Sequence, residues 1–223
     1  MKLTLLCNAG IALETDSAML LVDLPNQNVP PFYPLPDETW ESILNRQSPY
    51  DKVCGIWITH NHPDHCDLEK LHCYKRRWPE IPVFIPEITH IRGRGAIGPY
   101  QMQYQRMRHA PIANPPPHVV TWIEVEGKSV YLAADAVLDP LEHRSFIQGR
   151  KADVAIWNSM FLSRTETRAL MVETARHNLI YHMPAERPDH AGLWAKLEKN
   201  FERYGPELET VTVMERYPTT IEI

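Results

Sequence analysis

Short apolar runs separated by turn-forming residues open the chain. Apolar side chains dominate segments 3–7, 11–14 and 19–23, and the polar or small residues of 8–10 and 16–17 interrupt them. Runs of this length, bounded by Asn, Gly, Asp and Ser, are typical of strands joined by tight turns. The pattern predicts a three-stranded β-meander at the start of the chain.

The remainder mixes strand and helix patterns. Further strands are expected at 53–58, 83–85, 119–124, 129–134, 152–157, 179–181 and 211–214. Helices are expected at 38–45, 67–77 and 165–176, and a last helix carries an apolar stripe of Trp194, Leu197, Phe201 and Tyr204. Residues 86–117 follow no single pattern, although their stretch rich in Arg, Gln and Met favours helix. The mixture predicts sheets covered by helices.

Charge and length remove several classes of function. The 223 residues carry 23 basic and 28 acidic side chains, a net charge of −5, whereas nucleic acids and anionic membranes are bound through a positive field. The length suits one domain, 1–223, and no apolar run reaches the ~20 residues of a membrane span. Four scattered cysteines and a short, early-polar N-terminus favour a cytoplasmic protein. We therefore expect a small-molecule partner, and the pattern leaves self-association open.

Metal-ligand residues cluster directly after the strand expected at 53–58. His60, His62, Asp64 and His65 lie within six residues, in the segment Thr59-His60-Asn61-His62-Pro63-Asp64-His65. Side chains two apart in an extended segment point to the same side, so His60 and His62 can converge. Three imidazoles and a carboxylate suit Zn²⁺, Fe or Mn²⁺ better than Ca²⁺ or Mg²⁺. The competing interpretation is a solvated polar turn, but four convergent ligand types have no packing purpose there.

This segment resembles the HxHxDH signature of the metallo-β-lactamase superfamily. The opening strands that end at Asp23, the strand that ends in Ala134-Asp135, and the strand that ends at His182 resemble later motifs of the same family, in the same order. The resemblance implies an α+β fold, the αββα sandwich, in which two mixed β-sheets lie face to face with helices on their outer faces.

The resemblance also implies a ligand set for two divalent ions, zinc first, with manganese or iron as alternatives. His60, His62 and a later histidine would hold one ion, Asp64, His65 and His182 the other, and Asp135 would bridge them. His109 is favoured as the later histidine over His118, which begins an expected strand. Asp64 would act both as a ligand and as a catalytic residue that steers the nucleophile or passes a proton. Asp67 and Asp139 would orient an imidazole or, as we prefer, cap helices.

The family implies hydrolysis by a hydroxide shared between the two ions, with a small ester, lactone or phosphodiester as substrate. The short chain is most similar to the L-ascorbate-6-phosphate lactonase-like and small phosphodiesterase branches. Arg92, Arg94 and Arg108, together with Arg106, favour an anionic substrate, although an ordinary basic surface explains them equally well. His190 is either a pocket residue or a histidine at a helix start.

Three other functions compete with hydrolysis. A mono-iron oxidoreductase similar to a persulfide dioxygenase would need only one ion, so the presence of Asp64 and His182 argues against it. A nuclease is disfavoured by the net charge and by the short segment between His65 and His109. A binding protein without catalysis would have no need of the full ligand set. One departure from the family is Ala134, where glycine is usual, and we expect its side chain to crowd the metal.

Overall fold

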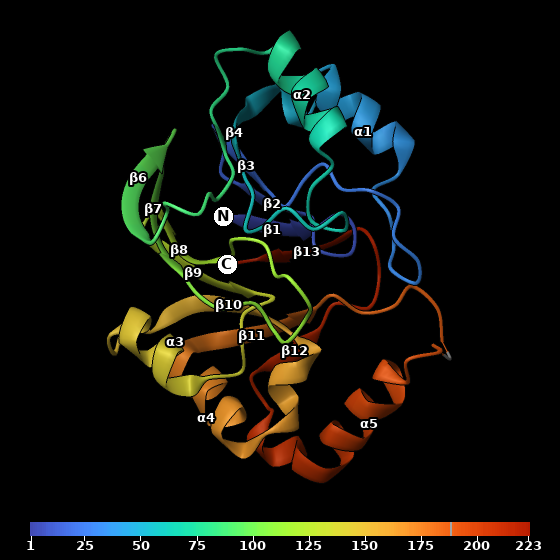
Figure 1. Cartoon of the computed structure of the whole chain (residues 1–223), viewed down its shortest axis with the longest axis vertical. Helices are drawn as coiled ribbons and strands as arrows, with labels where there is room; N and C mark the ends of the chain where they lie inside the picture. The colour runs from blue at the N-terminus through green and yellow to red at the C-terminus, as the bar shows by residue number, and fades with distance from the viewer. Residues whose placement is uncertain (188) are drawn as a thin grey trace.

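Two β-sheets pack face to face in the computed structural model, which describes residues 1–187 and 189–223 (Figure 1). The first sheet has the order β13 (Thr219–Glu222), β1 (Lys2–Leu5), β2 (Ile11–Glu14), β3 (Met19–Val22), β4 (Val53–Trp57), β5 (Val83–Phe84). The second has the order β12 (Val211–Val213), β11 (Ala175–Tyr181), β10 (Ala152–Asn158), β9 (Lys128–Ala134), β8 (Val119–Val125), β7 (Tyr100–Arg106), β6 (Arg92–Ile97). Both sheets combine parallel and antiparallel pairs.

Helices cover the outer face of each sheet (Figure 1). The first sheet carries α1 (Asp37–Leu44) and α2 (Leu68–Arg77), and the second carries α3 (Pro140–Ile147), α4 (Thr165–Thr174) and α5 (Leu193–Tyr204). Short 3-10 turns occupy Tyr50–Lys52, Ser159–Ser163 and Gly205–Glu207. No helix of the described residues is long and apolar enough to cross a bilayer. The αββα arrangement expected from the sequence is confirmed.

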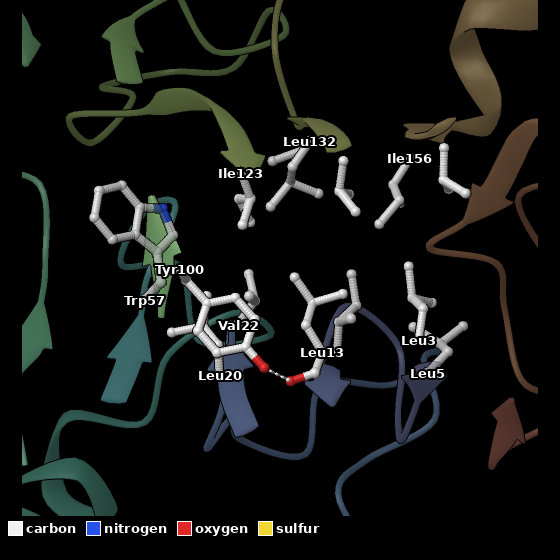
Figure 2. Close-up of a cluster of buried hydrophobic side chains, with 14 of the residues drawn as sticks. Leu3, Leu5, Leu13, Leu20, Val22, Trp57, Tyr100, Ile123, Leu132 and Ile156 are labelled. Atoms are coloured by element: carbon white, nitrogen blue, oxygen red, sulfur yellow. Dashed lines mark hydrogen bonds between the residues drawn. The ribbon is translucent and has the colours of Figure 1, made fainter. Parts of the chain in front are cut away.

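The alternation of β8 shows how the sequence builds two cores. Val119, Ile123 and Val125 belong to the core between the sheets, whereas Val120 and Trp122 belong to the core beneath α3, α4 and α5. Figure 2 shows the inner core, in which side chains of β1, β2 and β3 meet those of β8, β9 and β10. Each fully buried aliphatic side chain stabilises the fold by about 1.5–3 kcal/mol, so a shift of one residue in register would be costly.

The prediction of a helix within 86–117 is wrong. Residues 92–106 form the antiparallel hairpin β6–β7, which turns at Gly98-Pro99. Tyr100 and Met102 are buried, whereas the intervening Gln101 is exposed, so the period is two. The Tyr100 hydroxyl donates a hydrogen bond to Leu13 O (2.6 Å) in the opposite sheet. This tertiary contact and the period outweigh the helix propensity of Arg, Gln and Met.

Three further features differ from the sequence prediction: the end of one helix, one additional strand and one additional helix. The helix expected to reach 176 ends at Thr174, and β11 begins at Ala175, so the polar residues Arg176 and His177 lie in a strand. The strand at 211–213 is not the last, because β13 follows it and pairs with β1. Helix α3 has no counterpart among the helix ranges expected from the pattern, although Asp139 was expected to cap a helix, and it does so by accepting from Leu141 N at 3.0 Å.

A buried histidine on α3 gives a prediction about stability. The side chain of His143 is fully buried between Tyr131 Oη, which contacts Nδ1, and Val137 O, which lies 3.0 Å from Nε2. Burial lowers the pKa of His143 to about 4. Between this value and the ordinary pKa of about 6.5 the unfolded chain binds more protons than the folded chain, so this contribution to stability is lost as the pH falls through that window.

We therefore expect His143→Gln to flatten the pH dependence of unfolding. Between pH 6.5 and 4 the wild-type free energy of unfolding should fall on the order of 2 kcal/mol further than that of the variant, as measured by denaturant titration of metal-free protein. His72→Gln, at an exposed site of α2, is the control and should keep the wild-type profile. Parallel profiles for wild type and His143→Gln would contradict the assignment.

Candidate metal centre

The seven residues expected to bind metal all lie just beyond the ends of strands. His60, His62, Asp64 and His65 follow β4, His109 follows β7, Asp135 follows β9 and His182 follows β11. An antiparallel bridge between His109 and Ala136 joins two of these loops. Potential ligand atoms fall within 4.8 Å of one another in two groups, one of His60, His62, His109 and Asp135, the other of Asp64, His65 and His182.

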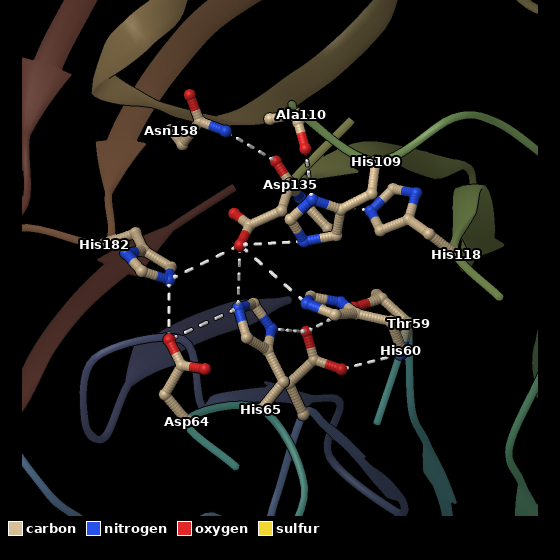
Figure 3. A network of polar contacts seen from close by, with 12 residues as sticks. Thr59, His60, Asp64, His65, His109, Ala110, His118, Asp135, Asn158 and His182 are labelled. Atoms are coloured by element: carbon tan, nitrogen blue, oxygen red, sulfur yellow. Dashed lines mark hydrogen bonds and ion pairs between the residues drawn. The ribbon is translucent and has the colours of Figure 1, made fainter. Parts of the chain in front are cut away.

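The carboxylate of Asp135 lies at the centre of the cluster (Figure 3). Its Oδ2 atom is 3.8 Å from His60 Nε2, 3.5 Å from His65 Nε2, 3.6 Å from His109 Nε2 and 3.7 Å from His182 Nε2. These distances are too long for hydrogen bonds. Two ligands of one tetrahedral zinc ion, each bound at 2.0–2.2 Å, are about 3.4 Å apart. The distances of 3.5–3.8 Å between Asp135 Oδ2 and the four imidazole nitrogens are therefore those expected when Asp135 and each histidine bind a common metal ion.

The same four Nε2 atoms are buried, and within the described part of the chain none of them makes a hydrogen bond of acceptable geometry. Buried polar atoms without partners are rare, because each costs about 1–3 kcal/mol. Burial also lowers the pKa of the His60 imidazole well below its usual range, and the neighbouring His65 adds to this effect. His60 is therefore neutral, as a metal ligand must be. The donor set fits divalent metal ions.

Hydrogen bonds at the opposite ring nitrogens direct these Nε2 lone pairs toward the centre. Asp23 accepts from Thr59 Oγ1 (2.7 Å) and from His65 Nδ1 (2.8 Å). Because the Thr59 hydroxyl donates to Asp23, it must accept from His60 Nδ1 at 3.0 Å. His109 Nδ1 donates to Ala110 O at 2.8 Å. Each of these three rings thus carries its proton on Nδ1 and leaves Nε2 free to bind metal.

Asp64 lies close to the other two members of the second group of candidate ligands, His65 and His182. Its Oδ2 atom lies 3.0 Å from His182 Nε2 and 3.9 Å from His65 Nε2, and Asn8 Nδ2 donates to it at 3.4 Å. Burial alone raises the pKa of this carboxyl, but the adjacent His182 and His65 outweigh it and lower the pKa to about 2. Asp64 is therefore an anion at neutral pH.

His118, the alternative to His109, faces the site in a different role. It is buried, and its Nε2 atom accepts a hydrogen bond from the backbone N–H of Asp135 at 3.1 Å. Burial lowers its pKa to about 3, so it remains neutral. Because His118 Nε2 already accepts this hydrogen bond, the geometry favours His109 as the metal ligand. His118 instead positions the backbone of Asp135.

Separate replacement of the two histidines distinguishes these roles. We expect His109→Ala to lose about one metal ion per chain, because it removes one of the Nε2 donors around Asp135. His118→Ala should retain the metal content of the wild type and lose about 2 kcal/mol of stability, since it leaves a buried N–H unpaired. Elemental analysis and thermal melting report the two effects, and the reverse assignment of metal loss would refute the proposed ligand.

Several residues that position the ligands were not predicted from the sequence. Asp23 supports two of the ligand histidines, and Asn158 Nδ2 donates to Ala134 O at 3.1 Å. Asp23, Ala134 and His182 adopt left-handed backbone conformations at the ends of β3, β9 and β11, with φ of 52°, 48° and 61°. Ala134 does not crowd the centre as expected, because its side chain packs in the inner core. The only feature of the sequence that could have indicated a role for Asp23 is its position at the end of an apolar strand.

The residues expected to bind substrate show no contact with the cluster among the described residues. Arg92 and Arg94 are exposed on β6, and His190 is exposed before α5. Arg108 is engaged elsewhere, since it bonds to Glu142 at 2.9 Å. Asp67 and Asp139 both cap helices, which confirms the preferred interpretation.

Comparison with known proteins identifies the fold. No protein-family model and no curated protein matches the chain in sequence. The metallo-β-lactamase fold protein YhfI from Bacillus subtilis is 14% identical, with a TM-score of 0.63, over 100% of this chain and 99% of that chain. A possible metal-dependent hydrolase from Veillonella parvula is 16% identical, with a TM-score of 0.68, over 100% and 99%. CmlA, a diiron β-hydroxylase from Streptomyces venezuelae, is 12% identical, with a TM-score of 0.62, over 100% and 54%.

These similarities span the whole of this chain, and they agree with the order of motifs in the sequence. The chain has the metallo-β-lactamase fold, and its cluster of histidines and aspartates lies where the ends of the two sheets meet.

Proposed function

We propose that the chain is a hydrolase that binds two divalent metal ions, zinc first. His60, His62 and His109 would hold one ion, Asp64, His65 and His182 the other, and Asp135 would bind both. The observation that carries this proposal is the position of Asp135 Oδ2, which lies 3.5–3.8 Å from four buried Nε2 atoms that make no well-formed hydrogen bond among the described residues. A site for a single ion leaves the second group of ligands without a purpose.

When bound by these residues, divalent ions would supply a nucleophilic water at neutral pH and would polarise the bond under attack. The protein contributes the geometry. Thr59, Asp23 and Ala110 O fix the rings of three ligand histidines. Asp64, held as an anion and hydrogen-bonded by Asn8, is placed to orient the attacking water and to accept its proton.

For the substrate we propose a small anionic ester, lactone or phosphodiester. The positive charge of two bound ions supports an anionic substrate. The arginines lend less support than expected, because Arg108 is engaged by Glu142 and Asp139. The similarity in fold to a possible metal-dependent hydrolase supports hydrolysis as the type of reaction.

Metal content combined with a hydrolysis assay tests the proposal. Protein purified without chelator or added metal should contain about two zinc or manganese ions per chain and should cleave members of a panel of phosphodiesters and lactones. His62→Ala should abolish cleavage and remain folded. About two irons would favour oxidative chemistry, because a diiron β-hydroxylase shares the fold, and about one iron would favour the mono-iron alternative. Retained hydrolysis in His62→Ala would refute the metal-centred function.

A further inference from the structure

Strand β6 forms an open edge of the second sheet. It pairs with β7 alone, and Figure 1 shows the hairpin β6–β7 at the margin of the molecule, away from α4 and α5. Gly95 and Ala96 are exposed, so this edge is accessible to solvent. An accessible edge strand offers its free backbone groups to another strand.

The backbone groups of residues 92, 94 and 96 face away from β7. Hydrogen-bonded and non-hydrogen-bonded pairs alternate along an antiparallel ladder. Arg106 N donates to Ile91 O at 2.6 Å, which marks these two residues as a hydrogen-bonded pair. Counting along the register from this pair, residues 92, 94 and 96 occupy positions of the other kind. Their N–H and C=O groups therefore point outward at every second residue, as pairing with an added strand requires.

Two arginines lie on the outer face of this edge. Ile97 packs in the inner core, and side chains alternate along a strand, so Gly93 and Gly95 share its face. Arg92 and Arg94 point to the opposite face. Both are exposed, and neither makes an ion pair within the described part of the chain. Their charges are therefore available to a partner.

A third guanidinium adds to the positive charge of this outer face. Gln103, opposite Arg94 on β7, accepts from Arg150 Nη1 at 3.1 Å. Burial lowers the pKa of Arg150, Glu124 raises it, and the nearby charges of Arg94 and Arg92 lower it further. The outer face of the edge is thus electropositive in a chain whose net charge is −5.

An apolar cavity lies beneath the inner face of the same edge. Its volume is about 350 Å³, and its lining includes Trp57, Phe84, Gly95 and Tyr104. Phe84 stacks on Trp57 with ring centroids 3.8 Å apart. A Cβ atom at Gly95 would meet nothing within 4 Å, which leaves room for a side chain that reaches in from a neighbouring strand.

We propose that β6 binds an extended acidic segment of a partner protein, which joins the second sheet as a further strand. Side chains directly opposite each other on paired strands share a face. Acidic residues two apart in the partner would therefore meet Arg92 and Arg94, whereas the residue opposite Gly95 would place an apolar side chain in the cavity. Strand β6 of a second copy does not fit, because it would bring further arginines to the same face. The site is independent of the metal ions.

Titration calorimetry of the full chain with the peptide acetyl-Ser-Leu-Glu-Thr-Glu-Leu-Ser-amide tests this site. We expect one peptide to bind per chain, and the peptide with lysine in place of both glutamates not to bind. The double variant Arg92→Glu, Arg94→Glu should weaken binding at least about tenfold, because attraction becomes repulsion. The matched control is Arg76→Glu with Arg77→Glu, at exposed sites of α2. It changes the net charge equally and should bind as the wild type does.

Ala96→Pro separates backbone pairing from charge. Proline lacks the N–H that faces outward at this position, and an edge strand tolerates proline on that side. The variant keeps both arginines and should weaken binding roughly three- to tenfold, as for the loss of one hydrogen bond. In the wild type, the peptide should also protect the Arg94 amide from hydrogen exchange. Wild-type affinity in Ala96→Pro or in the double variant, no binding by the wild type, or tighter binding of an oligouridylate than of the peptide would each overturn the proposal.

Discussion

Replacement of Asp135 by Asn is expected to release both metal ions. The Oδ2 atom of Asp135 faces four imidazole nitrogens (Figure 3), so it is the one group shared by both proposed ion sites. Burial raises the pKa of Asp135, but His182 and His65 hold it well below its usual range, and the carboxyl is an anion. An amide has nearly the same size and lacks the charge. Metal content should fall from about two ions per chain to below one, and hydrolysis by at least about 10³-fold.

The matched control for this variant is Asp139→Asn, four residues further along the same loop and helix. Asp139 caps α3 by accepting from Leu141 N and Glu142 N. Asparagine is also a good cap, so the cost should be below about 1 kcal/mol, and metal content should be unchanged. Elemental analysis after gel filtration distinguishes the two variants. An Asp135→Asn protein that keeps two ions would exclude a bridging role.

The sequence could predict the part of the site that is local. His60, His62, Asp64 and His65 share one loop after β4, so their spacing alone places them together. His109, Asp135 and His182 come from three other loops, and only the resemblance to a known family related them to the first four. Their proximity depends on the topology, in which β4, β9 and β11 end at the same margin of the sandwich.

Interactions between distant surface residues were beyond the reach of the sequence. Arg108 was a candidate for substrate binding, yet Glu142, far along the chain, binds it.

The hairpin β6–β7 was mistaken for helix because Gln, Met and Arg favour helix locally. The contact of Tyr100 with Leu13 O, which no local pattern reveals, determines the outcome.

The support of the ligands by Asp23 leads to the second large effect. Asp23 is fully buried and accepts from Thr59 N (2.7 Å), Thr59 Oγ1 (2.7 Å) and His65 Nδ1 (2.8 Å). Asparagine at this position has one oxygen and turns an N–H₂ toward a donor. We expect Asp23→Asn to lower the free energy of unfolding by about 3 kcal/mol, because a buried charged network is broken. Metal affinity should fall about 10- to 100-fold, as for other residues that orient metal ligands.

Asp153→Asn provides a control with the same bonding pattern outside the metal centre. Asp153 accepts from Ser129 N (2.9 Å) and Ser129 Oγ (3.0 Å), just as Asp23 accepts from the amide and hydroxyl of Thr59, and its third partner is the exposed Arg176. Both variants should lose stability in denaturant titrations, with a smaller loss for the partly exposed Asp153. In competition with a chromogenic chelator, only Asp23→Asn should bind metal more weakly. Equal affinities would mean that Asp23 stabilises the fold without orienting His60 and His65, because the shared loss of two hydrogen bonds cancels in the comparison.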